Sequence, residues 1–168
     1  MAKGDPHYKG ITIDGLEDLQ RQLEEVLPGA AFRLMRGVTH GVAQRIVARA
    51  KSRVPTGGDG TLKRAIKAKR GNPRNNRGKP FSDVVVEHGA GVKDDAFYWR
   101  FVEYGTQSHA QPKRGSYQHP GNSGAGFFKV AVASANADMD SLLQTEFKAK
   151  FDKLLRAEEK KAAKRSKG

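Results

Sequence analysis

The stretch Phe97-Tyr-Trp-Arg-Phe-Val-Glu-Tyr-Gly-Thr106 decides the fold of the middle of this chain. Five of its ten residues are aromatic, although aromatic residues make up only 8% of the sequence. Its apolar residues recur at helical spacing, which predicts a short helix that ends at Gly105. We interpret the rings as a core cluster. A carboxylate among them needs a partner, so we expect Glu103 to be mostly buried and bonded to a backbone N–H or to an Arg or Lys.

A short strand and a helix are predicted before residue 28. Residues 8–13 alternate at Ile11 and Ile13, which is typical of a strand. Asp14 begins the helix, with Glu17 three residues later as in a capping box, and a proline ends it. Its apolar stripe consists of Leu16, Leu19, Leu23 and Val26.

A second, longer helix is predicted from about Gly29 to Arg53. Its apolar residues recur every three or four positions along one face, and they are Ala31, Leu34, Val38, Val42, Ile46 and Ala50. Gly37 and Gly41 lie four residues apart on a nearby face. This spacing favours close packing of a neighbouring helix or strand. Pro55 ends the helix.

Strands are predicted in the middle of the chain and a helix near its end. Leu62 to Lys69 is interpreted as a strand with a basic exposed face. Ser82 to His88 is the clearest strand, because β-branched residues occupy its centre. The final helix begins near Phe127 and carries a long apolar stripe. Beyond Leu155 the composition becomes rich in Ala, Glu and Lys and then purely basic, so we expect the helix to fray there.

These elements predict an α+β fold, in which a small antiparallel sheet packs against two long helices, one near each end of the chain. Residues 1–7 are expected to be a disordered leader, and residues 8–156 a single domain. That domain includes long loops at 70–80 and 107–126. Residues 157–168 are expected to form a basic C-terminal tail.

The chain of 168 residues is strongly basic, with a formal net charge of +13 and no cysteine. Disulfides and thiolate metal sites are therefore excluded, and no apolar run is long enough to span a membrane. No acidic residue occurs between Gly60 and Ser82, where many basic residues gather. Such a cluster indicates an anionic partner or a solvated surface that keeps the protein soluble. The residues expected to contact a partner or DNA are Lys63, Arg64, Lys67, Lys69, Arg70, Arg74, Arg77 and Lys79, together with Lys113 and Arg114 in the second long loop.

No catalytic arrangement is apparent in the sequence. The histidines show no metal-binding spacing, although His109 and His119 flank the second long loop and could approach each other. Asp94 and Asp95 are interpreted as the N-cap of the aromatic helix. A metal-dependent nuclease stays open as an alternative, because its acids would combine with the basic surface. We expect no enzymatic activity, no cofactor and no metal.

Four short motifs follow one another along the chain: Ile13-Asp-Gly-Leu-Glu-Asp-Leu19; Val54-Pro-Thr-Gly57 with Leu62; Val102-Glu-Tyr-Gly-Thr106; and Gly126-Phe-Phe-Lys-Val-Ala131. In this order they resemble the small tail-completion, or head–tail joining, proteins of long-tailed bacteriophages, from about residue 9 to residue 155. The turn is stretched by Gly58-Asp-Gly60, and the last motif lacks the family's prolines and follows an unusually long loop. The motif residues with an expected structural role are Gly15, Leu16, Pro55, Gly57, Glu103, Tyr104, Gly105 and Thr106.

The resemblance implies a structural virion protein that forms a homo-oligomeric ring or collar, a connector at the head–tail junction with the sixfold symmetry of the tail. The implied partners are other neck and tail proteins, such as the tail terminator, the stopper or the tail tube. Genomic DNA is a further candidate contact, and no membrane is involved. The protein would lie in the host cytoplasm before assembly and in the virion afterwards.

A basic nucleic-acid-binding module without enzymatic activity is the alternative. The net charge, the basic loop and the basic tail support it. Against it, no nucleic-acid-binding motif is visible, and the aromatic residues gather in an apolar helix instead of alternating with Arg and Lys on a strand.

Overall fold

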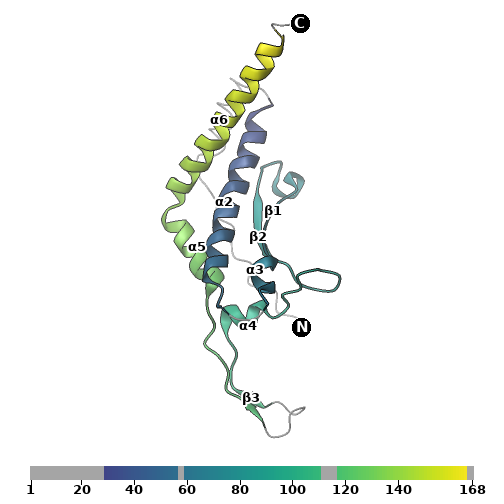
Figure 1. Ribbon diagram of the computed structural model, residues 1–168, viewed down its shortest axis with the longest axis vertical. Coiled ribbons are helices and arrows are strands. Elements are labelled where there is room, and N and C mark those ends of the chain that lie inside the picture. The colour runs from purple at the N-terminus through teal and green to yellow at the C-terminus, as the bar shows by residue number, and fades with distance from the viewer. Residues whose placement is uncertain (1–28, 57–58, 111–116, 166–168) are drawn as a thin grey trace.

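Helix α2 (Ala31–Arg53) lies at the centre of the architecture in the computed structural model, which describes residues 29–56, 59–110 and 117–165. Helices α5 (Phe127–Ala137) and α6 (Met139–Arg165) pack along one side of α2. Strands β1 (Ile66–Arg70) and β2 (Ser82–Val86) pack along the other side (Figure 1). The predicted α+β class, with a small antiparallel sheet and long helices near both ends of the described chain, is confirmed.

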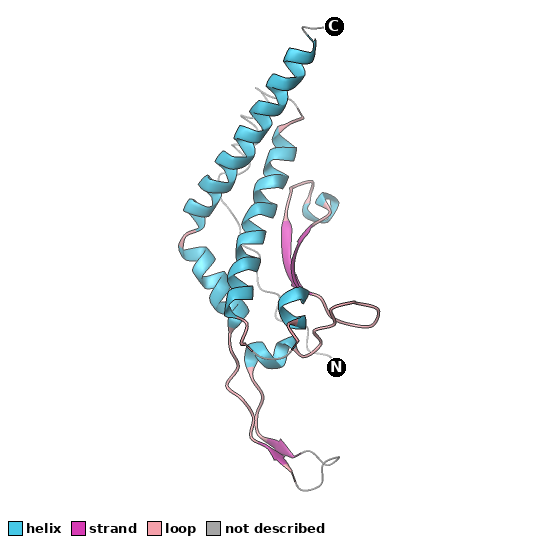
Figure 2. Cartoon of the chain, viewed as in Figure 1, coloured by secondary structure: helices cyan, strands magenta, loops and turns pink. Residues whose placement is uncertain are grey.

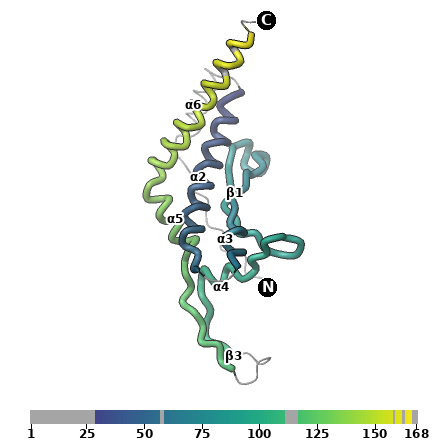
Figure 3. Tube along the Cα trace, in the orientation of Figure 1, coloured from purple at the N-terminus to yellow at the C-terminus, as the bar shows by residue number. Residues whose placement is uncertain are grey.

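Shorter elements complete the fold, and they are α3 (Thr61–Ala65), the 3-10 helix η1 (Pro73–Asn76), α4 (Trp99–Tyr104), β3 (His109–Ala110) and β4 (Gln118–His119). Both described sheets are two-stranded and antiparallel (Figure 2). Strand β1 pairs with β2 from Ile66 opposite Val86 to Arg70 opposite Ser82. Strands β3 and β4 belong to a projection that we call the arm, residues 105–110 and 117–124. The arm lies at one end of an elongated molecule, and the C-terminal part of α6 lies at the other end (Figure 3).

The buried face of α2 follows the predicted spacing, because all six residues of the expected apolar stripe are buried. One core cluster joins the end of α2 to Leu62, Ile66 and Phe127, whose ring is fully buried. A second cluster joins the middle of α2 to Ala135 and to the first turns of α6. The helix ends where Val54 takes the extended conformation that a following proline favours.

Gly41 lets α6 approach α2 closely, whereas Gly37, on the same side, leaves room to spare. A Cβ atom at Gly41 would lie 2.1 Å from Oε2 of Glu146, whereas one at Gly37 would lie 3.5 Å from the nearest atom of Lys150. Glu146 is buried at this contact, and its Oε1 accepts a hydrogen bond of 2.9 Å from Nε of Arg45. The predicted close packing of a neighbouring helix is therefore confirmed, and Gly41 leaves the space that the Glu146 carboxylate occupies.

The single C-terminal helix predicted from the sequence is in fact two helices that meet at Asp138. Arg49 of α2 donates hydrogen bonds to both carboxylate oxygens of Asp138, at 2.7 and 2.5 Å. This bidentate pair fixes the bend against α2, and its hydrogen bonds lower the pKa of Asp138. The expected fraying beyond Leu155 is wrong. Helix α6 continues to Arg165, because Ala, Glu and Lys all favour a helix.

The predicted strand from Leu62 to Lys69 is only partly right, because residues 61–65 form α3 and the strand begins at Ile66. Asp59 explains the helix. Its carboxylate accepts hydrogen bonds from the N–H and the hydroxyl of Thr61, at 2.9 and 2.7 Å, and so satisfies one of the first N–H groups of α3. The strand expected from Ser82 is confirmed as β2. The expected leader, the strand at 8–13 and the helix from Asp14 lie outside the described residues.

No described helix combines the length and the apolar character that a crossing of the bilayer requires.

We expect Gly37→Ala and Gly41→Ala to change the free energy of unfolding in opposite directions. Alanine favours a helix over glycine by about 1 kcal/mol, so Gly37→Ala should stabilise the protein, since its new methyl makes an ordinary contact. Gly41→Ala should destabilise it by roughly 1–3 kcal/mol, because the methyl displaces a buried, hydrogen-bonded carboxylate. Urea unfolding of the two variants measures the difference. Equal stabilisation by both would contradict the close α2–α6 contact.

Candidate docking site

Glu103 of α4 caps the beginning of α5. The residue is 3% exposed, and its carboxylate oxygens accept hydrogen bonds from the N–H groups of Phe128 and Lys129, both at 2.8 Å. The first N–H groups of a helix have no partner within the helix and carry partial positive charge. The carboxylate therefore supplies both the missing acceptors and a complementary charge. The expectation that Glu103 is buried and bonded to backbone N–H is confirmed.

Main-chain hydrogen bonds close the root of the arm on either side of this cap. The carbonyl oxygen of Val102 accepts a bond of 2.7 Å from Ala125, and that of Glu103 accepts one of 3.0 Å from Gly126. Thr106 and Asn122 then exchange two bonds, of 3.0 and 2.9 Å. We call the Glu103 cap and these main-chain bonds together the clamp.

The two chain segments of the clamp lie so close together that only a glycine fits at position 105. Its φ is +83°, a conformation that favours glycine. A Cβ atom at this position would lie 2.3 Å from the carbonyl oxygen of Asn122. The sequence Val102-Glu-Tyr-Gly-Thr106 thus builds the junction from which the arm leaves the core.

The arm itself occupies part of the loop predicted at 107–126. His109 and His119 are opposite each other in the β3–β4 pair, and their rings stack with centroids 5.0 Å apart. The approach considered from the sequence is therefore observed. Gln118 adds a side-chain hydrogen bond of 3.0 Å to the hydroxyl of Ser108.

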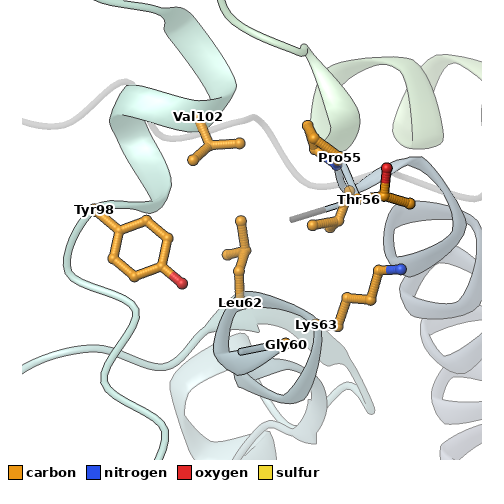
Figure 4. A pocket seen from close by; sticks show the side chains of 8 residues that line it. Pro55, Thr56, Gly60, Leu62, Lys63, Tyr98 and Val102 are labelled. Carbon is orange, nitrogen blue, oxygen red and sulfur yellow. The ribbon is translucent and has the colours of Figure 1, made fainter. Parts of the chain in front are cut away.

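A cleft of about 420 Å³ lies where the end of α2, α3 and α4 meet. Figure 4 shows Pro55 and Thr56 on one side of the cleft, with Leu62 in the middle. On the other side are Val102 of α4 and Tyr98, which directly precedes that helix. Lys63 lies beside the opening and is exposed. Pro55, a residue of the second motif, thus comes close to the aromatic helix that carries the third motif.

The interpretation of the aromatic rings as a core cluster is wrong for three of them. Phe97, Phe101 and Tyr104 are 67%, 55% and 51% exposed, and only Tyr98 and Trp99 pack against the core. The helix has six residues, and its buried face is taken by Glu103. A helix this short cannot place every ring of an aromatic-rich sequence toward one core, so several rings face outward.

The basic segment from residue 63 to 79, expected to contact a partner or DNA, contains most of α3 and all of β1 and η1. Its basic side chains are exposed, but three of them are already in ion pairs. Arg64 binds Asp94 at 2.9 Å, and Lys67 and Lys69 both bind Glu87. The hydrogen bonds from Lys67 and Lys69 lower the pKa of Glu87.

The far end of the β1–β2 hairpin carries the remaining basic residues. We call residues 70–79 the basic tip, and its exposed cations are Arg70, Arg74, Arg77 and Lys79. Asn72 holds the turn by accepting a hydrogen bond of 3.1 Å from the N–H of Arg74. No acidic residue occurs in the tip, so all of its formal charges are positive.

Asp94 and Asp95 do not cap the aromatic helix as predicted. Asp94 binds Arg64, while Asp95 accepts a hydrogen bond of 2.8 Å from the N–H of Gly89. The helix begins later, at Trp99. Among the described residues, no group of three or more His, Cys, Asp or Glu side chains could hold a metal ion.

The remaining residues named from the sequence, Gly15, Leu16, Gly57, Lys113 and Arg114, lie outside the described residues. Sequence reasoning missed the partner of Glu103, which is the beginning of α5. A signal for it exists, because Gly126 precedes α5 and offers no side-chain cap.

Replacing Glu103 is expected to loosen the clamp. Glu103→Ala should lower the free energy of unfolding by roughly 1–3 kcal/mol, because two buried N–H groups lose their acceptors. Glu103→Gln keeps one carbonyl acceptor but loses the charge, so its loss should be smaller. Thermal or urea unfolding of both variants tests this order. If both variants were as stable as the parent, the cap would not contribute to the stability of the protein.

Comparison with known proteins identifies a family over part of this architecture. The family described as "Bacteriophage HK97-gp10, putative tail-component" matches residues 17–105, a range that runs through α2, the β1–β2 hairpin and α4 up to the root of the arm. No curated protein and no solved structure matches the chain. Because the match covers more than half of the sequence, the chain belongs to the HK97-gp10-like family of phage tail components.

Proposed function

We propose that this protein is a tail-completion, or head–tail joining, protein that forms a homo-oligomeric ring at the head–tail junction. Membership of a tail-component family supports a structural role in the virion. The observation that carries the finer proposal is the arm, because the clamp fixes its root while its β3–β4 end lies away from the helical core (Figure 3). A firmly rooted projection is suited to reaching a neighbouring subunit.

A closed ring needs two different contact surfaces on each subunit, so that one surface meets the other around the ring. We propose the arm as one of these surfaces, because it projects from the helical core (Figure 1). We propose sixfold symmetry, which would match that of the tail. Further partners in this proposal are the tail terminator, the stopper or the tail tube, reached from the host cytoplasm during assembly.

The proposed role requires recognition and no chemical step. Asp94 and Asp95, the acids considered for a nuclease, each hold a neighbouring part of the fold. The basic tip would serve docking through long-range attraction, which is screened over about 8–10 Å at physiological ionic strength.

A phage that lacks this protein is expected to make heads and tails that do not yield stable, infectious virions. Electron microscopy of the knockout lysate, together with its infectious titre, measures this outcome. Adding the purified protein should restore joined particles. Normally joined, infectious particles in the knockout lysate would contradict a role at the junction.

One observation favours nucleic-acid binding as a second function. The basic tip presents its cations on a projecting turn, and cations of this kind bind phosphates with a strong dependence on salt. Protein docking and DNA contact would depend on the same residues of the tip. The two functions are therefore distinguished by measuring whether a tip variant loses binding to the virion particle or to DNA.

Replacing Arg70, Arg74 and Arg77 together with glutamine should leave the unfolding temperature nearly unchanged, because exposed charges contribute little to stability. The triple variant should bind its partner more weakly at low salt. The matched control replaces the exposed α6 residues Lys148, Lys153 and Arg156 with glutamine. Each set lowers the net charge of +13 by three.

Two binding measurements on these variants separate the alternatives: sedimentation with virion particles that lack the protein, and retention of duplex DNA. Weaker particle binding by the tip variant alone supports docking on protein. Weaker DNA binding by the tip variant alone supports the nucleic-acid alternative. Equal behaviour of tip and control variants in both measurements would show that only the overall charge matters.

A further inference from the structure

We propose that the arm-bearing end of the molecule binds an acidic segment of another virion protein. The surface consists of the exposed rings of Phe97, Phe101 and Tyr104 and of a groove beside Phe101, and we call it the aromatic face. This inference names a partner class for the proposed structural role. It rests on the role in the virion and does not require the position at the head–tail junction.

Large apolar side chains are exposed mainly near this end. In the described chain they are Phe97, Phe101, Tyr104, Tyr117 and Val130, with Leu155 on α6 as the one distant case. Phe97 is two-thirds exposed, and its ring meets that of Tyr98 edge to face at 5.6 Å. Phe101 and Tyr104 are three residues apart in α4 and so occupy neighbouring positions on its surface. Exposed apolar surface of this kind is typical of interaction sites, and aromatic residues contribute much of the binding energy at protein interfaces.

The groove gives a partner segment a place to lie. It has a volume of about 700 Å³ and runs from Phe101 along the arm, past Thr106 to His109 and His119. The hydroxyl oxygen of Thr106 is buried and has no hydrogen-bond partner among the described residues. Buried polar atoms are normally hydrogen-bonded, so Thr106 is a less completely satisfied part of the groove wall than the main-chain bonds around it.

Charge defines the chemistry of the segment. From residue 97 to residue 137 the only acidic residue is Glu103, whose carboxylate is buried in the clamp. Arg100 and Lys129 are exposed at the same end, with the guanidinium of Arg100 5.5 Å from the centre of the Trp99 ring. Asp94 and Asp95, just before Phe97, are partly exposed, but Arg64 pairs with the first and the N–H of Gly89 binds the second. The exposed charges in the described part of residues 97–137 are therefore cationic, which is complementary to an acidic partner.

The same observations disfavour two other occupants. A second copy that used the same face would bring cations against cations. Nucleic acid would be expected at the basic tip, where the described cations are denser, and duplex DNA offers no apolar hollow for the rings of Phe97 and Phe101. An acidic protein segment with apolar side chains satisfies both the charge and the rings.

The test uses the full-length protein, labelled with a fluorophore, and virion particles assembled without it. Binding is measured by co-sedimentation at low and high salt. Phe97→Ser combined with Phe101→Ser should weaken binding at least about tenfold. Lys129→Gln should weaken binding and reduce its salt dependence. Its folding should be retained, because the change adds no carboxylate beside Glu103 and the cap uses only the N–H of residue 129. Leu155→Ser, which alters the exposed apolar residue on α6, is the matched control and should bind like the parent.

Thermal unfolding first establishes that each variant is folded, as expected for exposed positions. Failure of the parent to bind the particles would overturn the proposal, and so would parental binding by the double serine variant. Loss of duplex DNA binding by that variant, with particle binding retained, would assign the face to nucleic acid instead. Loss of self-association in sedimentation velocity, with particle binding retained, would assign it to a second copy. The proposed role at the head–tail junction is tested separately. Electron microscopy of the particles that lack the protein shows whether their heads and tails are joined.

Discussion

The hydrogen bonds between the Glu103 carboxylate and the first N–H groups of α5 hold together parts of the chain that are otherwise far apart. Through them α4 is tied to the C-terminal helices, and α5 in turn places Phe127 in the core beside α2. The arm leaves and returns at this same point. Burying an isolated carboxylate would cost much free energy. Here the cost is offset, because two N–H groups donate hydrogen bonds to the carboxylate and the helix dipole favours its negative charge.

The helical side of the molecule depends on a second set of polar contacts, which lie along the boundary between α2 and the C-terminal helices. Gly41 leaves room for Glu146, which binds Arg45, and one turn further along Arg49 binds Asp138 at the bend between α5 and α6. Both pairs join α2 to the C-terminal helices. They fix how α6 lies on α2, whereas the apolar stripe alone would allow it to slide or rotate.

Local patterns in the sequence were sufficient for α2 and β2, because each depends on residues close together in the chain. The burial of Glu103 could be expected from its apolar neighbours, but its partners, the N–H groups of Phe128 and Lys129, could not. The pattern failed where a distant partner decides. The bend at Asp138 requires Arg49, which is distant in the sequence, so it does not follow from apolar spacing. Helix α3 was missed for another reason, because its local cap, the Asp59 carboxylate, is polar and does not contribute to an apolar pattern. The prediction for the aromatic helix failed for a related reason. Its aromatic composition indicates that the rings are buried, but a helix of six residues has only one face toward the core. For the docking site, exposure of the basic residues was predictable, but the pairing of Lys67 and Lys69 with Glu87 was not.

The clamp also makes the arm an exchangeable part. Its two ends are fixed to each other by main-chain bonds between Thr106 and Asn122, and by the cap on α5, which uses backbone N–H groups. Lengthening a closed loop costs little, roughly 0.6 kcal/mol for each doubling. The stability of the core therefore depends little on the residues between Thr106 and Asn122. Relatives could carry arms of different length and sequence on the same scaffold, which would let one fold serve tails with different neighbours.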